Sequence, residues 1–404
     1  MSRNKIVQDT DSDALLSKVS AESAGYYHDP LLKLFLPSNV DQGDVHKLPL
    51  FNRGTYVRVM AVSRLIDRFL LAPGTEKKQI ISLGAGSDTR PFHLLPKHGS
   101  NLVYHELDFD VSARRKAGLV AKHAVLHSAV AGPVEYDIHT PEPPHRRRRR
   151  SPPWLFASSR EPPSQSGAGP RHLHSSGGSS GGVNTPDIQE RHSASPGRHP
   201  HESETPLKSP SYYIHGVDLR QLMTPASLQL PGIDFSLPTL LVSECCLCYL
   251  EPDVSDAVLA AFVKAFTTSA SAASSSNQLG IVSYEPFSSD DQFGKVMIHN
   301  LAIRGISIPT MMAFPTLQAQ VSRLRGLGFK ATAAGDLKFV HDAWVEKDEM
   351  QRIDRLEMLD EREEFDLLVA HYGIYWGSTT PESDKADYRF AGTFEAWNEF
   401  RRQI

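Results

Sequence analysis

The 404-residue chain is poor in cysteine and has no long apolar run. Its three cysteines, Cys245, Cys246 and Cys248, fall within four residues, so they cannot join distant segments through disulfides. We therefore expect a reducing compartment, with the protein in the cytoplasm or in both cytoplasm and nucleus. The spacing matches no zinc pattern, so we interpret the thiols as small buried hydrophobic groups and expect no metal site.

The chain also lacks an apolar membrane segment and a strong net charge. No stretch approaches the about 18 consecutive apolar residues of a transmembrane helix, and residues 1–13 are too polar for the apolar part of a signal peptide. The net charge of −4 gives no general attraction for nucleic acid. These absences predict neither a membrane nor a nucleic-acid partner. We also expect a monomer, although the sequence does not determine the oligomeric state.

Residues 141–210 differ in composition from the rest of the chain. They contain 13 Pro, 7 Gly and 13 Ser, and only 10 of the 70 are apolar or aromatic. Such a segment cannot offset the entropy cost of ordering, so we expect a disordered insertion. Its five consecutive arginines at 146–150 could serve as a nuclear-targeting or RNA-binding signal, but we favour a solvated loop. A retained intron would also explain the whole segment. With ten basic and six acidic residues it leaves a net charge of −8 on the other 334 residues.

Outside the insertion, strand and helix patterns alternate as in α/β proteins. Buried strands are expected at Gln79–Leu83, Leu102–Leu107, Tyr212–Val217, Thr239–Ser243 and Leu279–Tyr284. Amphipathic helices are expected at Arg53–Leu71, Val111–His123, Pro252–Phe266, Gln292–Ile303 and Thr316–Gly326. From Asp290 onward we expect mostly helix, including a long pair around Met350–Tyr372. Residues 1–140 then form a helical cap and the first half of one domain, and residues 211–404 form its second half and a helical lid.

Four of the expected strands end at residues suited to a single ligand: Gly84, Asp108, Asp218 and Glu244. In open α/β sheets, ligands bind beyond the carboxyl ends of the strands. Gly84 begins a Gly-Ala-Gly turn where the backbone can approach a ligand closely. Asp108 follows 24 residues later, at the distance typical of a carboxylate that binds ribose hydroxyls.

The residues of this turn help to distinguish between two classes of cofactor. A nicotinamide dinucleotide site needs a third small residue, and Thr89 stands at that position. S-adenosylmethionine has no phosphate and needs only the Gly-rich turn and the ribose-binding acid. A methyltransferase, a nicotinamide enzyme and a purely structural turn all remain open at this point.

The other two strand ends extend the same ligand hypothesis. Asp218 can accept the exocyclic amine of an adenine while the Leu219 backbone N–H donates to the ring, although Asp218 also suits an ordinary helix N-cap. Glu244 would be costly to bury without a cationic partner, and the ammonium of a methionine group is one such partner.

Several separated motifs together resemble the leucine carboxyl methyltransferases. They are Arg53–Val59, Leu83–Thr89, Glu106–Asp108, Gly216–Arg220, Ser243–Leu250, Tyr284–Pro286, Gln292–Leu301 and Arg355–Glu361. The resemblance implies a Rossmann-like class I methyltransferase fold, with a mostly parallel central sheet and helical N- and C-terminal lid elements. It also implies S-adenosylmethionine as cofactor and methylation of the C-terminal leucine carboxylate of the protein phosphatase 2A catalytic subunit, giving a methyl ester.

The resemblance implies roles for individual residues as well. The residues expected to contact the cofactor are Lys18, Arg58, Gly84, Asp108, Asp218, Leu219 and Glu244. Arg58 and Tyr249 are expected to be catalytic by orienting the acceptor carboxylate. Without the resemblance, Lys18 and Arg58 would be interpreted as solvated surface charges, and Tyr249 as part of the core.

Three alternatives to the phosphatase enzyme remain. A small-molecule carboxyl or O-methyltransferase is the nearest, because many related enzymes share the pattern of residues 83–90. A tRNA wybutosine-type methyltransferase is disfavoured by the acidic body of the chain. An inactive module that only caps the phosphatase tail would bind the tail without binding S-adenosylmethionine.

Overall fold

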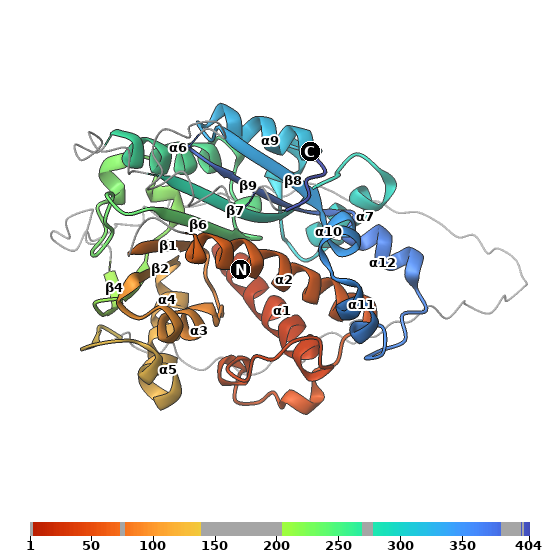
Figure 1. The fold of residues 1–404 in the computed structure, drawn as a ribbon, viewed down its shortest axis with the longest axis horizontal. Helices are drawn as coiled ribbons and strands as arrows, with labels where there is room; N and C mark the ends of the chain where they lie inside the picture. The colour runs from red at the N-terminus through yellow and green to blue at the C-terminus, as the bar shows by residue number, and fades with distance from the viewer. Residues whose placement is uncertain (1–2, 73–76, 139–203, 269–277, 381–396, 398–399) are drawn as a thin grey trace, which may run out of the picture. The chain divides into compact units, whose positions relative to one another are not determined.

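The computed structural model describes residues 3–72, 77–138, 204–268, 278–380, 397 and 400–404 (Figure 1). In these residues, nine strands form a single sheet in the order β3-β4-β5-β2-β1-β6-β7-β9-β8. The strands are β1 Lys78–Leu83, β2 Leu102–Asp108, β3 Glu135–Tyr136, β4 Glu204–Lys208, β5 Tyr212–Gly216, β6 Thr239–Glu244, β7 Leu279–Pro286, β8 Ala331–Asp336 and β9 Tyr372–Ser378.

The centre of the sheet is parallel. Strands β5, β2, β1, β6 and β7 pair in parallel, while β9 runs antiparallel between β7 and β8. From β1 the chain continues outward through β2 to β5, and then returns to place β6 on the other side of β1. In the register, Leu83 lies opposite Leu107 on one side and Ser243 on the other. The carboxyl ends of β2, β1 and β6 are therefore level at the topological switch point, where such folds bind ligands.

Helices cover both faces of the sheet. They are α1 Arg3–Ser23, α2 Pro49–Leu71, α3 Arg90–His98, α4 Asp110–Lys122, α5 Ala124–Ala129, α6 Pro252–Thr268, α7 Gln292–Ile303, α8 Pro309–Ala313, α9 Leu317–Gly326, α10 Leu337–Trp344, α11 Lys347–Ile353 and α12 Arg362–Val369. One core lies between the sheet and the side of α1, α2, α3 and α4, and a second lies under α6 and α9 (Figure 1). The strands β1 and β7 are buried along their whole length, as expected for strands covered on both faces.

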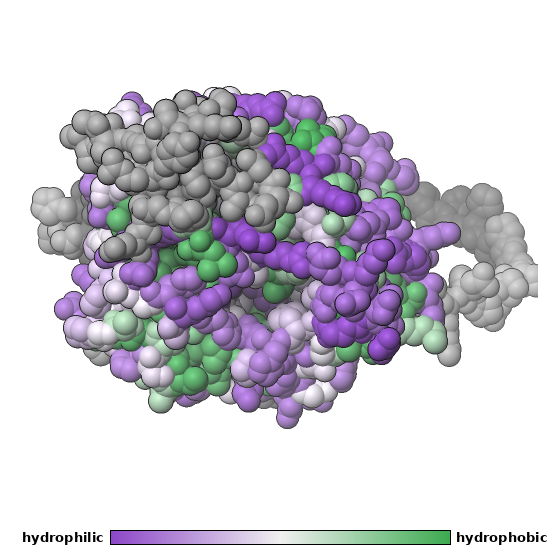
Figure 2. Space-filling model, viewed as in Figure 1, coloured by the Kyte–Doolittle hydropathy of each residue, from purple (hydrophilic) through white to green (hydrophobic). Residues whose placement is uncertain are grey.

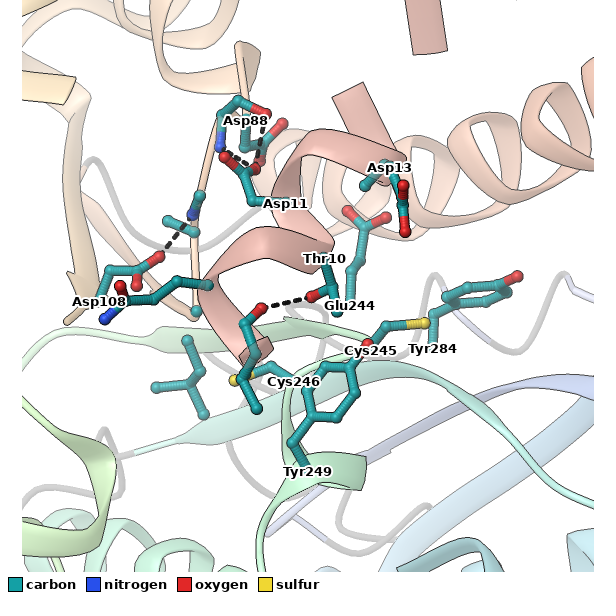
Figure 3. A pocket seen from close by; sticks show the side chains of 18 of the residues that line it. Thr10, Asp11, Asp13, Asp88, Asp108, Glu244, Cys245, Cys246, Tyr249 and Tyr284 are labelled. Carbon is teal, nitrogen blue, oxygen red and sulfur yellow. Dashed lines mark hydrogen bonds between the residues drawn. The ribbon is translucent and has the colours of Figure 1, made fainter. Parts of the chain in front are cut away.

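Helix α1 differs from the core helices. Its buried residues, Leu15, Val19, Ser20 and Ala21, all lie in its C-terminal half. Its N-terminal half is half-buried or exposed and lies across the carboxyl ends of the central strands (Figures 1 and 3). The space-filling view shows hydrophilic residues predominating on the visible face, interspersed with smaller apolar patches (Figure 2). No helix in the described parts of the chain is long and apolar enough to cross a membrane.

The predicted α/β fold class, with a mostly parallel central sheet in a Rossmann-like arrangement, is confirmed, and the final third is mostly helical as expected, although its strands were missed. Two antiparallel strands, β8 and β9, stand where we expected mostly helix. The expected long helical pair around Met350–Tyr372 consists of the two short helices α11 and α12 followed by the start of β9. Strand β8 consists mainly of small residues and so lacks the β-branched and aromatic pattern that signals a strand. Strand β9 contains Ile374, Tyr375 and Trp376, so it carried a strand signal that the prediction missed.

The expected insertion needs a correction at its C-terminal end. We expected disorder through residue 210, but residues 204–208 form β4, which pairs antiparallel with β5. Backbone pairing with an existing strand orders this segment despite its unfavourable composition. Residues 139–203, which include the five consecutive arginines, lie outside the described residues.

Candidate functional site

A cavity of about 480 Å³ opens at the carboxyl ends of β1, β2 and β6. All eight residues predicted for the site line it: Lys18, Arg58, Gly84, Asp108, Asp218, Leu219, Glu244 and Tyr249. They come from α1, from α2, and from the carboxyl ends of β2 and β6 or the segments after β1, β5 and β6, so only the tertiary fold brings them together.

The Gly-rich turn after β1 has a conformation that requires glycine. Gly84 and Gly86 have φ values of +63° and +47°, in the left-handed region. A Cβ on Gly84 would lie 2.5 Å from the Cys246 sulfur, and one on Gly86 would overlap the Asp11 carboxylate. Cys246 and Asp11 therefore occupy the space that the two Cβ atoms would need, and both glycines line the cavity.

Asp108 is held against this turn. Its carboxylate accepts hydrogen bonds from the backbone N–H groups of Gly86 and Phe109, each at 2.7 Å (Figure 3). Burial raises the pKa of Asp108, and these two donors offset only part of that increase. The fold thus fixes the direction of the carboxylate, while its expected contact with ribose remains a prediction.

Asp218 makes the local contacts that we had considered as the alternative. It caps the short 3₁₀ helix Leu219–Gln221 by accepting from the Arg220 backbone N–H at 3.0 Å. Its carboxylate also pairs with the Arg220 side chain, whose Nε lies 2.9 Å from Asp218 Oδ1. The structure shows the N-cap directly, and the predicted adenine contacts of Asp218 and Leu219 remain predictions.

Glu244 is the centre of a group of five charged side chains, which we name the charged cluster: Lys18, Arg58, Asp88, Arg90 and Glu244. Arg58 Nε donates to Glu244 Oε2 at 2.8 Å, and Arg90 pairs with the other oxygen of the same carboxylate. Arg90 also lies 3.0 Å from Asp88, and Lys18 lies 3.6 Å from the same carboxylate. None of these side chains is more than 17% exposed.

The charged cluster carries more positive than negative charge, since three cations face two carboxylates. Burial alone would raise the pKa of Glu244, but Arg90, Arg58 and Lys18 outweigh it and hold that pKa far below its usual range. Burial likewise would lower the pKa of Arg58, but Glu244 holds it above its usual range. Both groups stay ionised at neutral pH, and the surplus positive charge beside the cavity favours an anionic ligand group.

Lys18 and Arg58 are therefore not the solvated charges that the sequence pattern alone indicated. Arg58 also lies over the ring of Tyr284, with its guanidinium carbon 4.8 Å from the ring centroid. The ring of Tyr284 is in turn stacked on that of Tyr372 at a centroid distance of 5.5 Å. The guanidinium is thus supported by an acid on one side and an aromatic stack on the other.

Tyr249 lies on the 3₁₀ helix Leu247–Tyr249, which a buried carboxylate holds in place. Glu285 accepts from the backbone N–H groups of Leu247 at 3.2 Å and Cys248 at 3.1 Å. Burial raises the pKa of Tyr249 well above its usual value, so its phenol stays protonated and able to donate. Figure 3 shows Tyr249 facing Thr10 of α1 in the cavity.

Helix α1 is held over the cavity by hydrogen bonds and ion pairs along its length. Asp11 accepts from the Ser87 backbone N–H at 2.8 Å and from its hydroxyl at 2.7 Å (Figure 3). Asp13 pairs with Arg304, and Arg3 lies 2.9 Å from Glu251. Together with Lys18, these residues tie α1 to three separate parts of the domain.

Sequence reasoning missed several residues of the site, notably Asp11, Asp88 and Tyr284, which line the cavity, and Arg90, which belongs to the charged cluster. Asp88 and Arg90 lie in the quoted turn motif, so a signal was present, but an acid and a base two residues apart at a helix start also suit local capping. Asp11 gave no signal, because its contact with Ser87 joins residues 76 positions apart.

The three cysteines are free thiols at the edge of this site. Cys248 is buried and the other two are half-buried, so the prediction of small buried groups fits Cys248 best. Burial raises the pKa of Cys245 to about 12, which keeps its thiol protonated. Within the described residues, no group of three or more His, Cys, Asp or Glu side chains is arranged to hold a metal ion.

Comparison with known proteins identifies close relatives. The family model described as "Leucine carboxyl methyltransferase" matches residues 1–146 and 183–263. "Leucine carboxyl methyltransferase 1" of Yarrowia lipolytica is 38% identical over 93% of this chain and 98% of its own length. The protein of the same name from Schizosaccharomyces pombe is 32% identical over 98% of each chain. Among solved structures, geranyl diphosphate C-methyltransferase from Streptomyces coelicolor A3(2) matches with a TM-score of 0.40 and 6% identity, over 92% of this chain and 96% of its own.

Proposed function

Because the chain belongs to the leucine carboxyl methyltransferase family, we propose that this methyltransferase uses S-adenosylmethionine to methylate the C-terminal leucine carboxylate of the protein phosphatase 2A catalytic subunit. The product is a methyl ester. The observation that carries the proposal is the charged cluster, which offers surplus positive charge to a carboxylate inside a cavity at the switch point of the sheet.

The residues present fit the cofactor. The backbone of the turn at Gly84 and Gly86 lines the cavity, and the half-buried Asp108 carboxylate held against it suits ribose hydroxyls. Asp218 and Leu219 line the same cavity and would hold the adenine, while Glu244 would accept from the cofactor ammonium. S-adenosylmethionine supplies an electrophilic methyl group on a sulfonium.

The acceptor needs no general base. An α-carboxyl group has a pKa of about 3.3–3.7, so a C-terminal leucine is already ionised at neutral pH. The task of the protein is then to hold the carboxylate oxygen in line with the methyl group, and such positioning can contribute about 7–11 kcal/mol. Arg58 and the protonated hydroxyl of Tyr249 are the side chains we propose for this, since both line the cavity and both donate hydrogen bonds.

Helix α1 supports the same proposal. Its hydrogen bonds with Ser87 and its ion pairs with Arg304 and Glu251 hold it over the cavity. Exclusion of water strengthens the attraction between Arg58 and a carboxylate, because the local dielectric is lower. It also protects the cofactor from hydrolysis.

The test is transfer of a tritiated methyl group from S-adenosylmethionine to the purified phosphatase catalytic subunit. We expect label that mild base releases, as an ester requires, and no label on a phosphatase that lacks its terminal leucine. Base-stable label, or equal labelling of the truncated phosphatase, would contradict the proposal. Calorimetry with S-adenosylmethionine alone provides the separate check that the chain binds the cofactor.

A further inference from the structure

The hydroxyl of Tyr249 has a neighbour on α1 that the proposed reaction does not yet use. Figure 3 shows Tyr249 facing Thr10 of α1, and both residues line the cavity. The Thr10 side chain is a hydrogen-bond partner of the Tyr249 hydroxyl. Since the two residues lie on separate elements, this contact depends on α1 lying over the cavity.

The proton of the Thr10 hydroxyl is already in use within the helix. Thr10 Oγ1 donates to the backbone carbonyl of Val7 at 2.6 Å. A threonine hydroxyl has one proton and two lone pairs, so toward Tyr249 it can only accept a hydrogen bond. The protonated phenol of Tyr249 is therefore the donor, and Thr10 determines the direction in which it donates.

The other contacts of Tyr249 do not determine this direction. Arg3 Nη2 donates to the Tyr249 backbone carbonyl at 3.4 Å, so it restrains the main chain and not the hydroxyl. Apolar packing restrains the plane of the ring but not the rotation of the phenolic O–H bond. The residues of that apolar cluster are Cys248, Ile306, Ile308 and Met311.

The position of Thr10 distinguishes it from other threonines that make the same bond within a helix. Threonine is less favourable than alanine in a helix interior, yet Thr10 stands between Val7 and Ala14 on the face of α1 that lines the cavity. Thr267 of α6 also donates to a carbonyl of its own helix, that of Val263 at 2.8 Å, but it is exposed and does not line the cavity. The bond to Val7 therefore does not by itself explain a hydroxyl at this place.

We propose that Thr10 is a positioning residue for methyl transfer, which holds the Tyr249 hydroxyl aimed into the cavity until the acceptor carboxylate replaces Thr10 as its hydrogen-bond acceptor. This inference rests on the proposed function, in which Tyr249 orients that carboxylate. A carboxylate is a stronger acceptor than a hydroxyl, so the exchange favours the bound substrate. Helix α1 thereby supplies part of the catalytic arrangement in addition to covering the cavity.

The experiment is a double-mutant cycle between Thr10 and Tyr249. It measures kcat for methyl transfer to the leucine-ended phosphatase by wild type, Thr10→Val, Tyr249→Phe and the variant that combines both changes. Thr10→Val keeps the shape of the side chain without its hydroxyl, whereas a further variant, Thr10→Ser, keeps the hydroxyl. Thr267→Val is the control, because it removes an equivalent bond within a helix away from the cavity. Thermal melting and the KM for S-adenosylmethionine are measured for every enzyme.

We expect Thr10→Val to lower kcat about tenfold, which corresponds to the loss of one hydrogen bond. Thr10→Ser should keep most of the wild-type kcat. In the Tyr249→Phe background, Thr10→Val should cause no further loss, because no phenolic hydroxyl remains to be oriented. The KM for S-adenosylmethionine and the melting temperature should stay at wild-type values in Thr10→Val, and Thr267→Val should match wild type throughout.

A wild-type kcat in Thr10→Val, or an equal loss with and without the Tyr249 hydroxyl, would overturn the inference. So would a raised KM for S-adenosylmethionine together with a lowered melting temperature, because Thr10 would then only hold α1 in place. An unchanged kcat in Tyr249→Phe would overturn it together with the catalytic role of Tyr249. Failure of the proposed function would look different, because wild type itself would then leave the leucine-ended phosphatase unlabelled.

Discussion

Two buried ionic groups lie close together in this domain and behave differently. The charged cluster, with Glu244 between Arg58 and Arg90, has three cations for two carboxylates, and its members other than Arg90 line the cavity. The second group, the balanced pair, is Glu106 with Lys116 at 2.7 Å, completed by the Tyr212 hydroxyl at 2.8 Å. Its members are at most 3% exposed, and none lines the cavity.

The comparison separates a ligand site from a structural network. In the balanced pair each charge has its partner within the protein, so no charge is left for a ligand. Even so, burial raises the pKa of Glu106 to about 7, because Lys116 and Tyr212 do not fully offset the loss of water. In the charged cluster the surplus of cations holds Glu244 ionised and leaves attraction for one further anion. Net charge and access to a cavity therefore indicate the site better than burial does.

The largest effect is expected at Arg58. Arg58→Ala should lower kcat/KM for methyl transfer to the phosphatase by about 1,000-fold, because no guanidinium remains to orient the acceptor carboxylate. This is the upper range for the loss of one preorganised hydrogen-bond donor. Arg58→Lys keeps the charge and should recover part of the rate. Circular dichroism and thermal melting check that the fold survives. Wild-type turnover by a folded Arg58→Ala enzyme would refute this role.

Breaking the balanced pair should affect stability instead. Lys116→Met leaves Glu106 buried without its cation and should reduce the free energy of unfolding by about 3 kcal/mol. Urea denaturation measures this loss. The kcat/KM of the folded fraction should change less than tenfold, since the pair does not line the cavity. A normal stability with a large loss of turnover would reverse our distinction between the two groups.

Gly84→Ala should have an intermediate effect. The positive φ disfavours a side chain, and the added Cβ would press on Cys246, so we expect a stability loss of about 1–2 kcal/mol together with weaker cofactor binding. Gly99→Ala is the control, because Gly99 also has positive φ but has nothing within 4 Å of a Cβ and lies outside the cavity wall. Calorimetry with S-adenosylmethionine should detect weaker binding in Gly84→Ala but not in Gly99→Ala. Equal affinities of Gly84→Ala and wild type would disprove a close approach of the cofactor to the Gly84 backbone.

The smallest effect concerns pH. Because the folded pKa of Glu106 is raised to about 7, its contribution favours folding below its usual pKa, and this advantage is lost as pH rises through about 7. In Glu106→Gln, unfolding free energies at pH 5 and pH 8 should therefore differ less than in wild type. Glu135→Gln, on the exposed edge of β3, should keep the wild-type difference. An unchanged difference in Glu106→Gln would show that other groups dominate.

The extent to which the site was predictable depends on the kind of residue. Gly84, Asp108, Asp218 and Glu244 were found because each follows a buried strand, and parallel strands bring their carboxyl ends to one edge. Lys18 and Arg58 came only from the family resemblance, because a cation on a helix has the same local pattern whether it faces solvent or a cavity.

The same limit explains the errors in the helices. Three consecutive basic residues at 114–116 are typical of the solvated side of a helix, yet Arg114 and Lys116 are buried. Lys116 is buried because Glu106, on another element, lies within 2.7 Å. Periodicity along one segment does not contain that information.

The sequence by itself determined the order of strands and turns at the centre of the sheet, since apolar runs ended by glycine or acid are local signals. It also determined the glycine turn, whose backbone angles disfavour other residues. Tertiary structure alone decided which charges meet. Lys18 and Asp88 are 70 positions apart, and Arg58 and Glu244 are 186 apart. Their pairing depends on the packing of α1 and α2 against the sheet, because the sign of a charge is local but its partner is not.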